Sequence, residues 1–243
     1  MRFRAKLSCA MPWLIGLLLM QFGNAALADP TLTPHTAEYK IKISVLGGQL
    51  RTRLQEVENG SRAEWAIEAT GMSRIIARGA IRENSVFVES PDGLRPKEFK
   101  SDDSLSKGGE TIDFQFDWDS GEITGTIDGT DFHTGITGLV HDRVSLQYGL
   151  MHDLMNGIHR SEYSLQDAEK FKPLQITNIG TKQVKVPFGT FEAVGIQHQS
   201  EGSSRFTTLW CVEELGFLPV IIEQHRKGKL QVRAVLTDYS PGP

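Results

Sequence analysis

Three polar residues that lie close together in the sequence could carry hydrolytic chemistry. His141, Asp142 and Ser145 have the side chains of a base, an acid and a nucleophile, and a serine nucleophile needs its base within hydrogen-bond reach. The same residues also fit the start of a helix, with Asp142 as the N-cap and the Ser145 hydroxyl bonded locally. No G-x-S-x-G elbow surrounds any serine. The pattern favours capping, so we assign no catalytic residue and keep a hydrolase as the third hypothesis.

Histidines and carboxylates give no spacing typical of a metal site. Zinc ligands usually come in short-spaced pairs, whereas four of the seven histidines are seven to eleven residues apart: His133, His141, His152 and His159. Acidic residues between Asp113 and Asp119 alternate with aromatic residues, which is typical of the outward face of a strand. We therefore expect neither a metal nor a cofactor. A pair of sugar-cleaving carboxylates leaves no spacing signature and stays an open alternative.

The stretch from His141 to Met155 is the one place where apolar residues recur at helical spacing. They form two stripes, one of Val144, Tyr148, Met151 and Met155 and one of Leu146, Leu150 and Leu154. Together the stripes cover roughly 200° of the helix, about twice the width of a core-facing stripe. We expect a helix over Val144–Met155 that is mostly enclosed, for example by a curved sheet.

Several apolar residues around this helix could bind an apolar ligand. The flexible thioethers of methionine suit a surface that adapts to its ligand, and curved antiparallel sheets often leave a cavity at their mouth. Inward-facing aromatic residues are more often core, and Trp65, Trp118 and Phe114 fit that alternative. The predicted ligand-binding residues are Tyr148, Met151, Leu154, Met155 and Trp210.

The amino terminus has the pattern of a cleaved secretory signal. Arg2, Arg4 and Lys6 precede an apolar run over 10–20, and Ala26-Leu27-Ala28 supplies the small residues of a cleavage site. The run is about half the length of a membrane span. We expect residues 1–28 to be a cleaved signal peptide and residues 29–243 to be a single β-rich domain, exported to the periplasm.

Charge and cysteine content narrow the partners of the exported part. Without the first 28 residues, 23 basic residues face 30 acidic ones, a formal charge of −7. Nucleic acids and anionic membrane surfaces attract clustered Lys and Arg, so from the overall charge we expect neither a nucleic-acid partner nor binding to an anionic membrane surface. Only Cys211 remains, and a single cysteine cannot close an internal disulfide. No later stretch is apolar enough to span a membrane.

Most of the remaining chain alternates apolar and polar residues, the period of half-buried strands. Ile112, Phe114 and Phe116, for example, alternate with Asp113 and Gln115. Gly47-Gly48, Asn59-Gly60 and Ser120-Gly121 are typical of hairpin turns. We predict about a dozen strands and one main helix, without internal repeats.

Several short motifs resemble one bacterial family. They are His141-Asp142-Arg143-Val144-Ser145-Leu146, which opens the helix, Val186-Pro187-Phe188-Gly189-Thr190-Phe191, Leu209-Trp210 and Leu215-Gly216-Phe217-Leu218-Pro219-Val220. Their order and spacing resemble the domain-of-unknown-function family 3108, exported proteins of Gram-negative envelopes. The resemblance covers nearly the whole exported part. It implies a periplasmic location and a β-rich fold, and it implies no known activity.

We therefore expect a mainly β protein, a curved antiparallel sheet or half-open β-barrel with one main α-helix against its concave face. The leading hypothesis is a non-enzymatic envelope protein that binds or carries an apolar or lipid-like ligand. The alternative is a structural factor that binds an envelope protein and no ligand. Fold alone does not decide between them.

Overall fold

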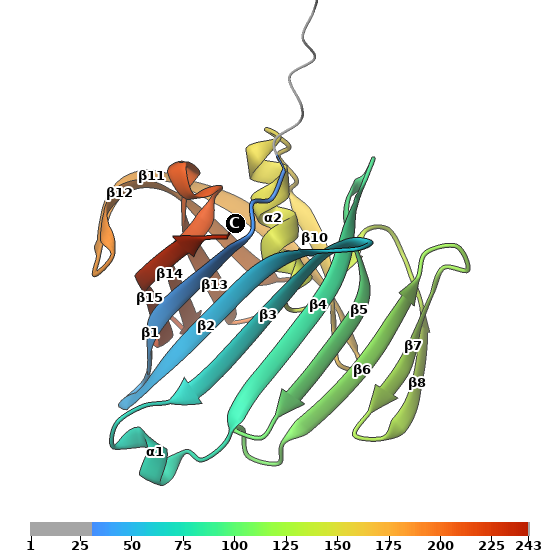
Figure 1. Cartoon of the computed structure of the whole chain (residues 1–243), viewed down its shortest axis with the longest axis horizontal. Helices are drawn as coiled ribbons and strands as arrows, with labels where there is room; N and C mark the ends of the chain where they lie inside the picture. The colour runs from blue at the N-terminus through green and yellow to red at the C-terminus, as the bar shows by residue number, and fades with distance from the viewer. Residues whose placement is uncertain (1–30, 243) are drawn as a thin grey trace, which may run out of the picture.

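The computed structural model describes residues 31–242, so the predicted signal peptide lies outside the described residues. The described chain folds into one 15-stranded sheet with the order β8-β7-β6-β5-β4-β3-β2-β1-β15-β14-β13-β12-β11-β10-β9 (Figure 1). All neighbouring strands are antiparallel except β9 and β10, which run parallel. The first and last strands, β1 and β15, pair with each other in the middle of the sheet.

The first half of the sheet is a meander in which each strand pairs with the next. Its strands are β1 (His35–Ile43), β2 (Leu46–Val57), β3 (Gly60–Ala69), β4 (Ala80–Ser90), β5 (Gly93–Asp103), β6 (Glu110–Asp117), β7 (Glu122–Ile127) and β8 (Thr130–Gly135). A short helix, α1 (Ser73–Ile76), lies in the connection between β3 and β4.

The second half begins with a crossover to the opposite end of the sheet. The strand β9 (Val140–His141) leads into the main helix α2 (Ser145–Met155). The strands that follow are β10 (Glu162–Asp167), β11 (Lys170–Val186), β12 (Gly189–Ser200), β13 (Arg205–Val212), β14 (Leu218–Arg226) and β15 (Lys229–Pro241), with a 3-10 turn at Glu213–Leu215 before β14.

The sheet is curved and open. Its end strands β8 and β9 do not pair with each other in the described part of the chain. Instead β9 contacts β5, and α2 contacts β4, β5 and β9. Figure 1 shows β11–β14 curling behind the meander, with α2 above and between the two halves. The expectation of a mainly β fold built on a large curved antiparallel sheet is confirmed.

The alternation seen in the sequence places the core on one face of the strands. In β6, Ile112, Phe114 and Phe116 are buried, while Asp117 is exposed. In β1 the buried residues Tyr39 and Ile41 alternate in the same way with exposed lysines. These side chains belong to one large apolar cluster that also contains α2 residues such as Tyr148. The helix is thus packed on the same side of the sheet as the buried residues of β1 and β6.

The number of strands is fifteen, where the sequence pattern indicated about a dozen. Strand β8 carries few buried residues, and β9 is only two residues long, so neither shows a clear alternation. Strand β11, by contrast, is one long continuous strand, whose pairing with β12 shifts register between Asn178 and Thr181. Among residues 31–242 there is no helix long and apolar enough to cross a membrane.

Candidate ligand-binding cavity

A cavity of about 370 Å³ lies between α2 and the two halves of the sheet. The helix contributes Leu146, Gln147 and Leu150. The rest of the lining is mostly apolar and comes from β1–β3 and β10–β15: Ile41, Leu50, Trp65, Ile67, Tyr163, Leu165, Ile176, His198, Thr207, Leu209, Ile222, Gln224, Val232 and Ala234, with Arg143 at the start of the helix. Residues from both ends of the chain therefore face one common space.

The start of α2 is fixed by Asp142, whose side chain is fully buried. One carboxylate oxygen accepts hydrogen bonds from the backbone N–H groups of Val144 and Ser145, both at 2.8 Å. The other accepts from the hydroxyls of Ser145 at 2.8 Å and of Ser85 on β4 at 2.6 Å. The Ser145 hydroxyl oxygen in turn accepts the Asp142 N–H at 3.0 Å. This is a reciprocal capping arrangement, and it ties the helix to the sheet.

The same contacts describe how His141, Asp142 and Ser145 are arranged at this site. The Ser145 hydroxyl bonds to Asp142, and both His141 ring nitrogens are without a hydrogen-bond partner among the described residues. All three side chains are fully buried. Because a serine nucleophile needs contact with its base, the arrangement is that of a helix cap, as the pattern favoured.

His141 and Gly149 set the distance between the helix and β9. A β-carbon at Gly149 would lie 2.7 Å from Cε1 of the His141 ring and 3.2 Å from its Nε2. The ring also lies 5.7 Å from the Tyr163 ring, centroid to centroid. Burial lowers the pKa of His141 to about 4, so the ring is neutral at pH 7.

Gly149→Ala is expected to destabilise the protein by about 1 kcal/mol. Alanine is about 1 kcal/mol better than glycine inside a helix, but the added methyl group meets a buried ring with no room to move, and overpacking costs about 1–3 kcal/mol. The check is the urea midpoint of the variant. The comparison variant is Gly157→Ala, outside the helix, where a β-carbon has open space. Any loss of stability there reflects the backbone strain of alanine at a φ of +66° and no steric contact. A Gly149→Ala protein more stable than the wild type would contradict this close approach.

The end of α2 is held by a buried carboxylate, Asp153. It accepts hydrogen bonds from Arg160 and, at 2.6 Å, from the Tyr163 hydroxyl on β10. Burial alone would raise the pKa of Asp153, but hydrogen bonds from His152, Arg160 and Tyr163 hold it below its ordinary value. Both ends of the helix are therefore tied to the sheet by a buried aspartate.

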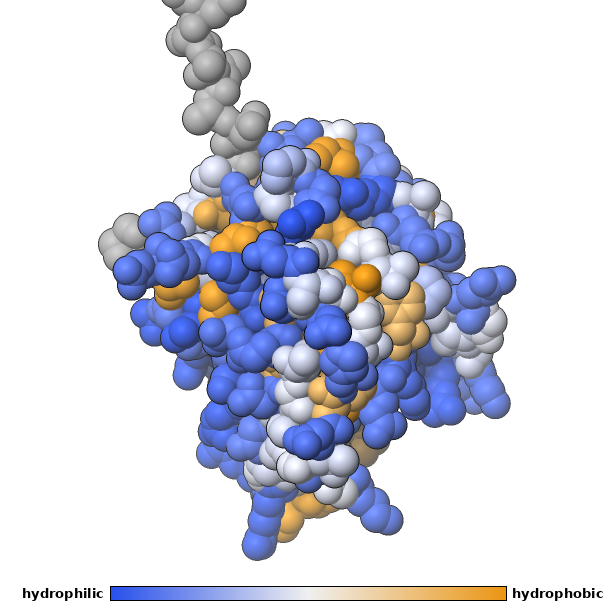
Figure 2. Space-filling view, turned by 90° about the vertical axis from the view of Figure 1, so that its right-hand side faces the viewer, coloured by the Kyte–Doolittle hydropathy of each residue, from blue (hydrophilic) through white to orange (hydrophobic). Residues whose placement is uncertain are grey.

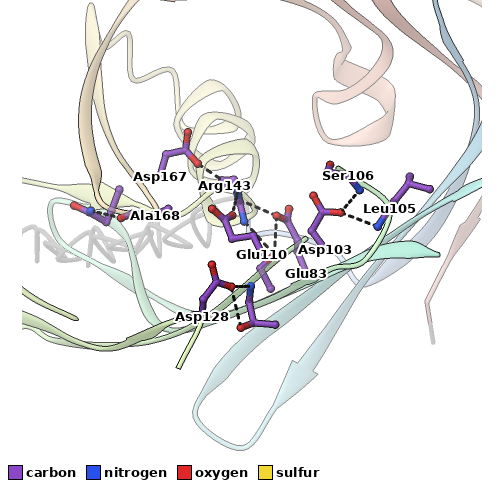
Figure 3. Close-up of polar contacts among 12 residues, drawn as sticks. Glu83, Asp103, Leu105, Ser106, Glu110, Asp128, Arg143, Asp167 and Ala168 are labelled. Carbon is purple, nitrogen blue, oxygen red and sulfur yellow. Dashed lines mark hydrogen bonds and ion pairs between the residues drawn. The ribbon is translucent and has the colours of Figure 1, made fainter. Parts of the chain in front are cut away.

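Arg143 forms a cluster of charges at one side of the cavity (Figure 3). Its guanidinium lies 2.8 Å from Glu83 on β4, 3.1 Å from Glu110 on β6 and 3.3 Å from Asp167 on β10. Lys172 also pairs with Asp167. Burial raises the pKa of Glu83, although Arg143 opposes the shift. The cluster connects the first half of the sheet to β10, and its carboxylates outnumber its cations by three to two.

The other polar groups of the cavity are uncharged at neutral pH. His198 lines the cavity, and burial lowers its pKa to about 4. Gln147, Thr207 and Gln224 complete the polar part of the lining. Among the described residues that line the cavity, Arg143 alone carries a charge at pH 7, and that charge is already paired. The described residues also bring together no group of three His, Cys, Asp or Glu side chains able to hold a metal ion.

The five residues predicted from the sequence to bind a ligand lie around this cavity and not in its lining. Tyr148 and Met151 are buried in the main apolar cluster, and Met155 is packed against it. Leu154 borders a second hollow, which it shares with Ile158 and Tyr163 among others. The buried Trp210 has the Lys182 ammonium 3.6 Å above its ring.

Some of the residues that line the cavity, although not among the five predicted, belong to patterns that the sequence shows. Leu146 and Leu150 belong to the second apolar stripe of the helix, and Trp65 had been assigned to the core. The strand residues, such as Ile222, carry no local signal, because only the curvature of the sheet brings them to the helix. Cys211 is buried and free, and burial raises the pKa of its thiol to about 12, so it is an unreactive core residue in this structure.

Two solved structures are similar to this chain at low sequence identity. A β-barrel-like protein of the domain of unknown function DUF1849 from Brucella abortus is 12% identical, with a TM-score of 0.59, over 88% of this chain and 99% of that chain. A candidate exported protein with a YmcC-like fold from Bacteroides fragilis is 11% identical, with a TM-score of 0.34, over 87% of this chain and 97% of that chain. At these identities the first likeness shows the fold alone.

Sequence comparisons give the family. Among curated proteins, none matches the sequence. The model of the family described as "Protein of unknown function (DUF3108)" matches residues 36–232, which is most of the chain and includes α2, its cap and nearly every strand. The resemblance noted in the sequence motifs is confirmed, and the chain belongs to the DUF3108 family.

Proposed function

We propose that this protein is an exported, periplasmic binding protein that shelters an apolar, uncharged, lipid-like ligand in the cavity beside α2. In this proposal the helix lies against the concave face of the sheet and forms one wall of the site. Tyr148 and Met151, on the core-facing side of the same helix, are packed in the main apolar cluster and hold that wall in place. The observation that carries the proposal is the apolar lining of the cavity.

The size of the cavity supports a ligand. Pockets for small molecules are usually about 300–1,000 Å³, and this cavity has about 370 Å³. Water in contact with this mostly apolar lining carries an unfavourable free energy. Larger side chains at Ala234 or Thr207 could fill it, yet small ones stand there. An apolar ligand would recover that free energy by burial.

The charges near the cavity support an uncharged ligand. Arg143 is surrounded by Glu83, Glu110 and Asp167, so an anionic head group would meet an excess of carboxylates. A free fatty acid is therefore disfavoured relative to a neutral lipid or another uncharged amphipathic molecule. Gln147 and Gln224 offer neutral hydrogen-bonding groups to its polar part.

The proposal of export rests on the amino-terminal sequence. The basic residues, the apolar run and the Ala26-Leu27-Ala28 site have the pattern of a cleaved signal. A periplasmic protein that carries apolar molecules between membranes needs such a shelter, since the aqueous compartment offers none.

Leu146→Asp is expected to weaken the binding of a neutral fluorescent apolar probe, N-phenyl-1-naphthylamine, by at least about tenfold. Leu146 lines the cavity, and a carboxylate there makes its wall polar. The matched control is Leu154→Asp, two turns along the same helix, equally half-buried but outside the cavity lining. We expect this variant to change probe affinity by less than about twofold. The measurement is a fluorescence titration of folded proteins, checked by circular dichroism.

The Leu146→Asp and Leu154→Asp variants distinguish binding in the cavity from binding in the second hollow, which Leu154 borders. Loss of binding in Leu154→Asp alone would place the ligand in the hollow beside that residue. A wild-type protein that binds neither the probe nor any co-purifying lipid would refute the proposal and favour a factor that binds an envelope protein.

A further inference from the structure

One end of the sheet exposes several large apolar side chains. Val45, in the turn between β1 and β2, is 88% exposed. Met72, Ile75 and Ile76, in and beside α1, are 78%, 64% and 77% exposed. Exposed apolar side chains are unremarkable singly, but a group in one place marks an interaction site.

Hydrogen bonds hold these segments together. The Gly47 N–H donates to the Ser73 hydroxyl at 2.8 Å, and the Thr70 N–H donates to the Gly47 carbonyl at 3.0 Å. The turn between β14 and β15 lies alongside, because the Ser44 N–H donates to the Gln231 carbonyl at 3.1 Å. The start of β15 adds Leu230, which is 46% exposed. In Figure 1, α1 projects beyond the ends of the neighbouring strands.

The same three segments are strongly basic. Residues 42–48, 70–79 and 224–231 contain six Lys and Arg residues and no Asp or Glu: Lys42, Arg74, Arg78, Arg226, Lys227 and Lys229. All six are exposed, and in the described part of the chain none of them forms an ion pair. The whole chain carries a formal charge of −4. The positive charge is therefore concentrated at this end, against the overall balance.

We propose that these three segments form a docking tip for an anionic lipid surface, with Val45, Met72, Ile75 and Ile76 entering the bilayer interface and the six cations binding lipid phosphates. Interfacial binding needs apolar side chains that protrude by one layer and cations beside them. Both are present on projecting turns.

A protein partner fits this tip less well. A stable protein interface needs about 800 Å² on each side, with a well-packed centre. The exposed apolar side chains here lie on separate segments, in the β1–β2 turn and in or beside α1, at one end of the sheet. A lipid surface requires no shape complementarity, so it suits such an end better than a folded acidic partner does.

The docking tip is adjacent to the cavity along the same strands. Ile43 and Leu230 lie two residues from Ile41 and Val232, which line the cavity. Residues two apart in a strand share a face, and Ile43 pairs with Val232 across β1 and β15. The apolar wall of the cavity thus continues toward the tip, so docking there would bring the cavity close to the lipids.

Vesicle flotation of the purified protein tests the proposal. The probes are phosphatidylcholine vesicles with and without about one quarter phosphatidylglycerol. We expect the wild type to float with the anionic vesicles, at least about tenfold more than with the neutral ones, and to lose this binding as salt rises. Two variants should each lower the partition at least about tenfold: Val45→Ser with Met72→Ser, Ile75→Ser and Ile76→Ser, and Arg74→Gln with Arg78→Gln, Lys227→Gln and Lys229→Gln.

The matched control changes exposed apolar and basic residues elsewhere: Phe171→Ser and Ile179→Ser with Lys170→Gln and Lys185→Gln. This variant should bind like the wild type, and all variants should keep the wild-type urea midpoint and affinity for the naphthylamine probe. Equal binding of the wild type to neutral and anionic vesicles would overturn the proposal. So would equal losses in the control variant. Unchanged binding in the apolar tip variant would also overturn it, because the vesicles would then be bound by surface charge alone.

Discussion

Replacing Asp142 by alanine is expected to lower the free energy of unfolding by about 3 kcal/mol, the largest effect of any single substitution considered for this protein. Asp142 is fully buried and accepts four hydrogen bonds, two from backbone N–H groups and two from serine hydroxyls. Loss of an N-cap costs about 0.5–2 kcal/mol. A buried donor left without a partner, such as the Ser85 hydroxyl, costs about 1–3 kcal/mol more. Relief of the buried charge offsets part of this cost.

The control for this prediction is Asp142→Asn. The amide oxygen can still accept the N–H groups of Val144 and Ser145, and both serine hydroxyls can rotate to accept from the amide nitrogen. We expect a loss of about 1 kcal/mol, measured as a shift of the urea midpoint at unchanged slope. An alanine variant no less stable than the asparagine variant would contradict the role of Asp142 as the cap of α2.

The second large effect is a loss of stability in mild acid that depends on His141. The pKa of this buried ring is about 4, against an ordinary value of 6.5. Below pH 6.5 the unfolded chain binds a proton at this position before the folded protein does, so the free energy of unfolding falls until the pH approaches 4. Between pH 7 and pH 4.5 this contribution amounts to about 2 kcal/mol.

A His141→Leu variant isolates the effect. Its packing loss is the same at every pH, while His198 and Asp153 titrate in both proteins and cancel in the comparison. The stability difference between wild type and variant should therefore shrink, or reverse, by about 2 kcal/mol on going from pH 7 to pH 4.5. Parallel pH profiles of the two proteins would show that the His141 ring is solvated and free to ionise in the folded state.

Much of the sheet could be predicted because its residues alternate locally. Ile112, Phe114 and Phe116 are apolar at every second position, and that period alone places them on the buried face of β6. The hairpin at Ser120-Gly121 was visible for the same reason, since turn chemistry is local. Strand β9 was not predicted, because two residues cannot show an alternation of apolar and polar side chains. It nevertheless directs the chain into α2.

The helix shows where local pattern stops being sufficient. The sequence indicated both apolar stripes and the cap, and α2 is indeed mostly buried. The sequence did not indicate which of the two stripes lines the cavity and which packs in the core. The stripe with Tyr148 and Met151 packs in the core, while Leu146 and Leu150 line the cavity. That choice depends on the curvature of the sheet, which is a sum of small twists over many strands.

The docking tip is another feature that local sequence patterns do not predict. The three basic segments of the docking tip are about 20 to 180 residues apart in the sequence. The pairing of β1 with β15 brings the first and last together. Figure 2, a view onto the side of the molecule that carries β7 and β8, shows a largely hydrophilic surface with small scattered apolar areas. A short stretch of sequence cannot predict how charged and apolar side chains are distributed over the surface, because that distribution depends on the order of the strands in the sheet.

The most direct measurement is native mass spectrometry of the protein purified from the periplasm, with solvent extraction and lipid analysis of the same sample. The account predicts a bound, uncharged lipid-like molecule in defined stoichiometry, lost from the Leu146→Asp protein and retained by the Leu154→Asp protein. A wild-type protein with only its own mass, which also fails to take up the naphthylamine probe, would contradict the claim that the cavity beside α2 is a ligand site.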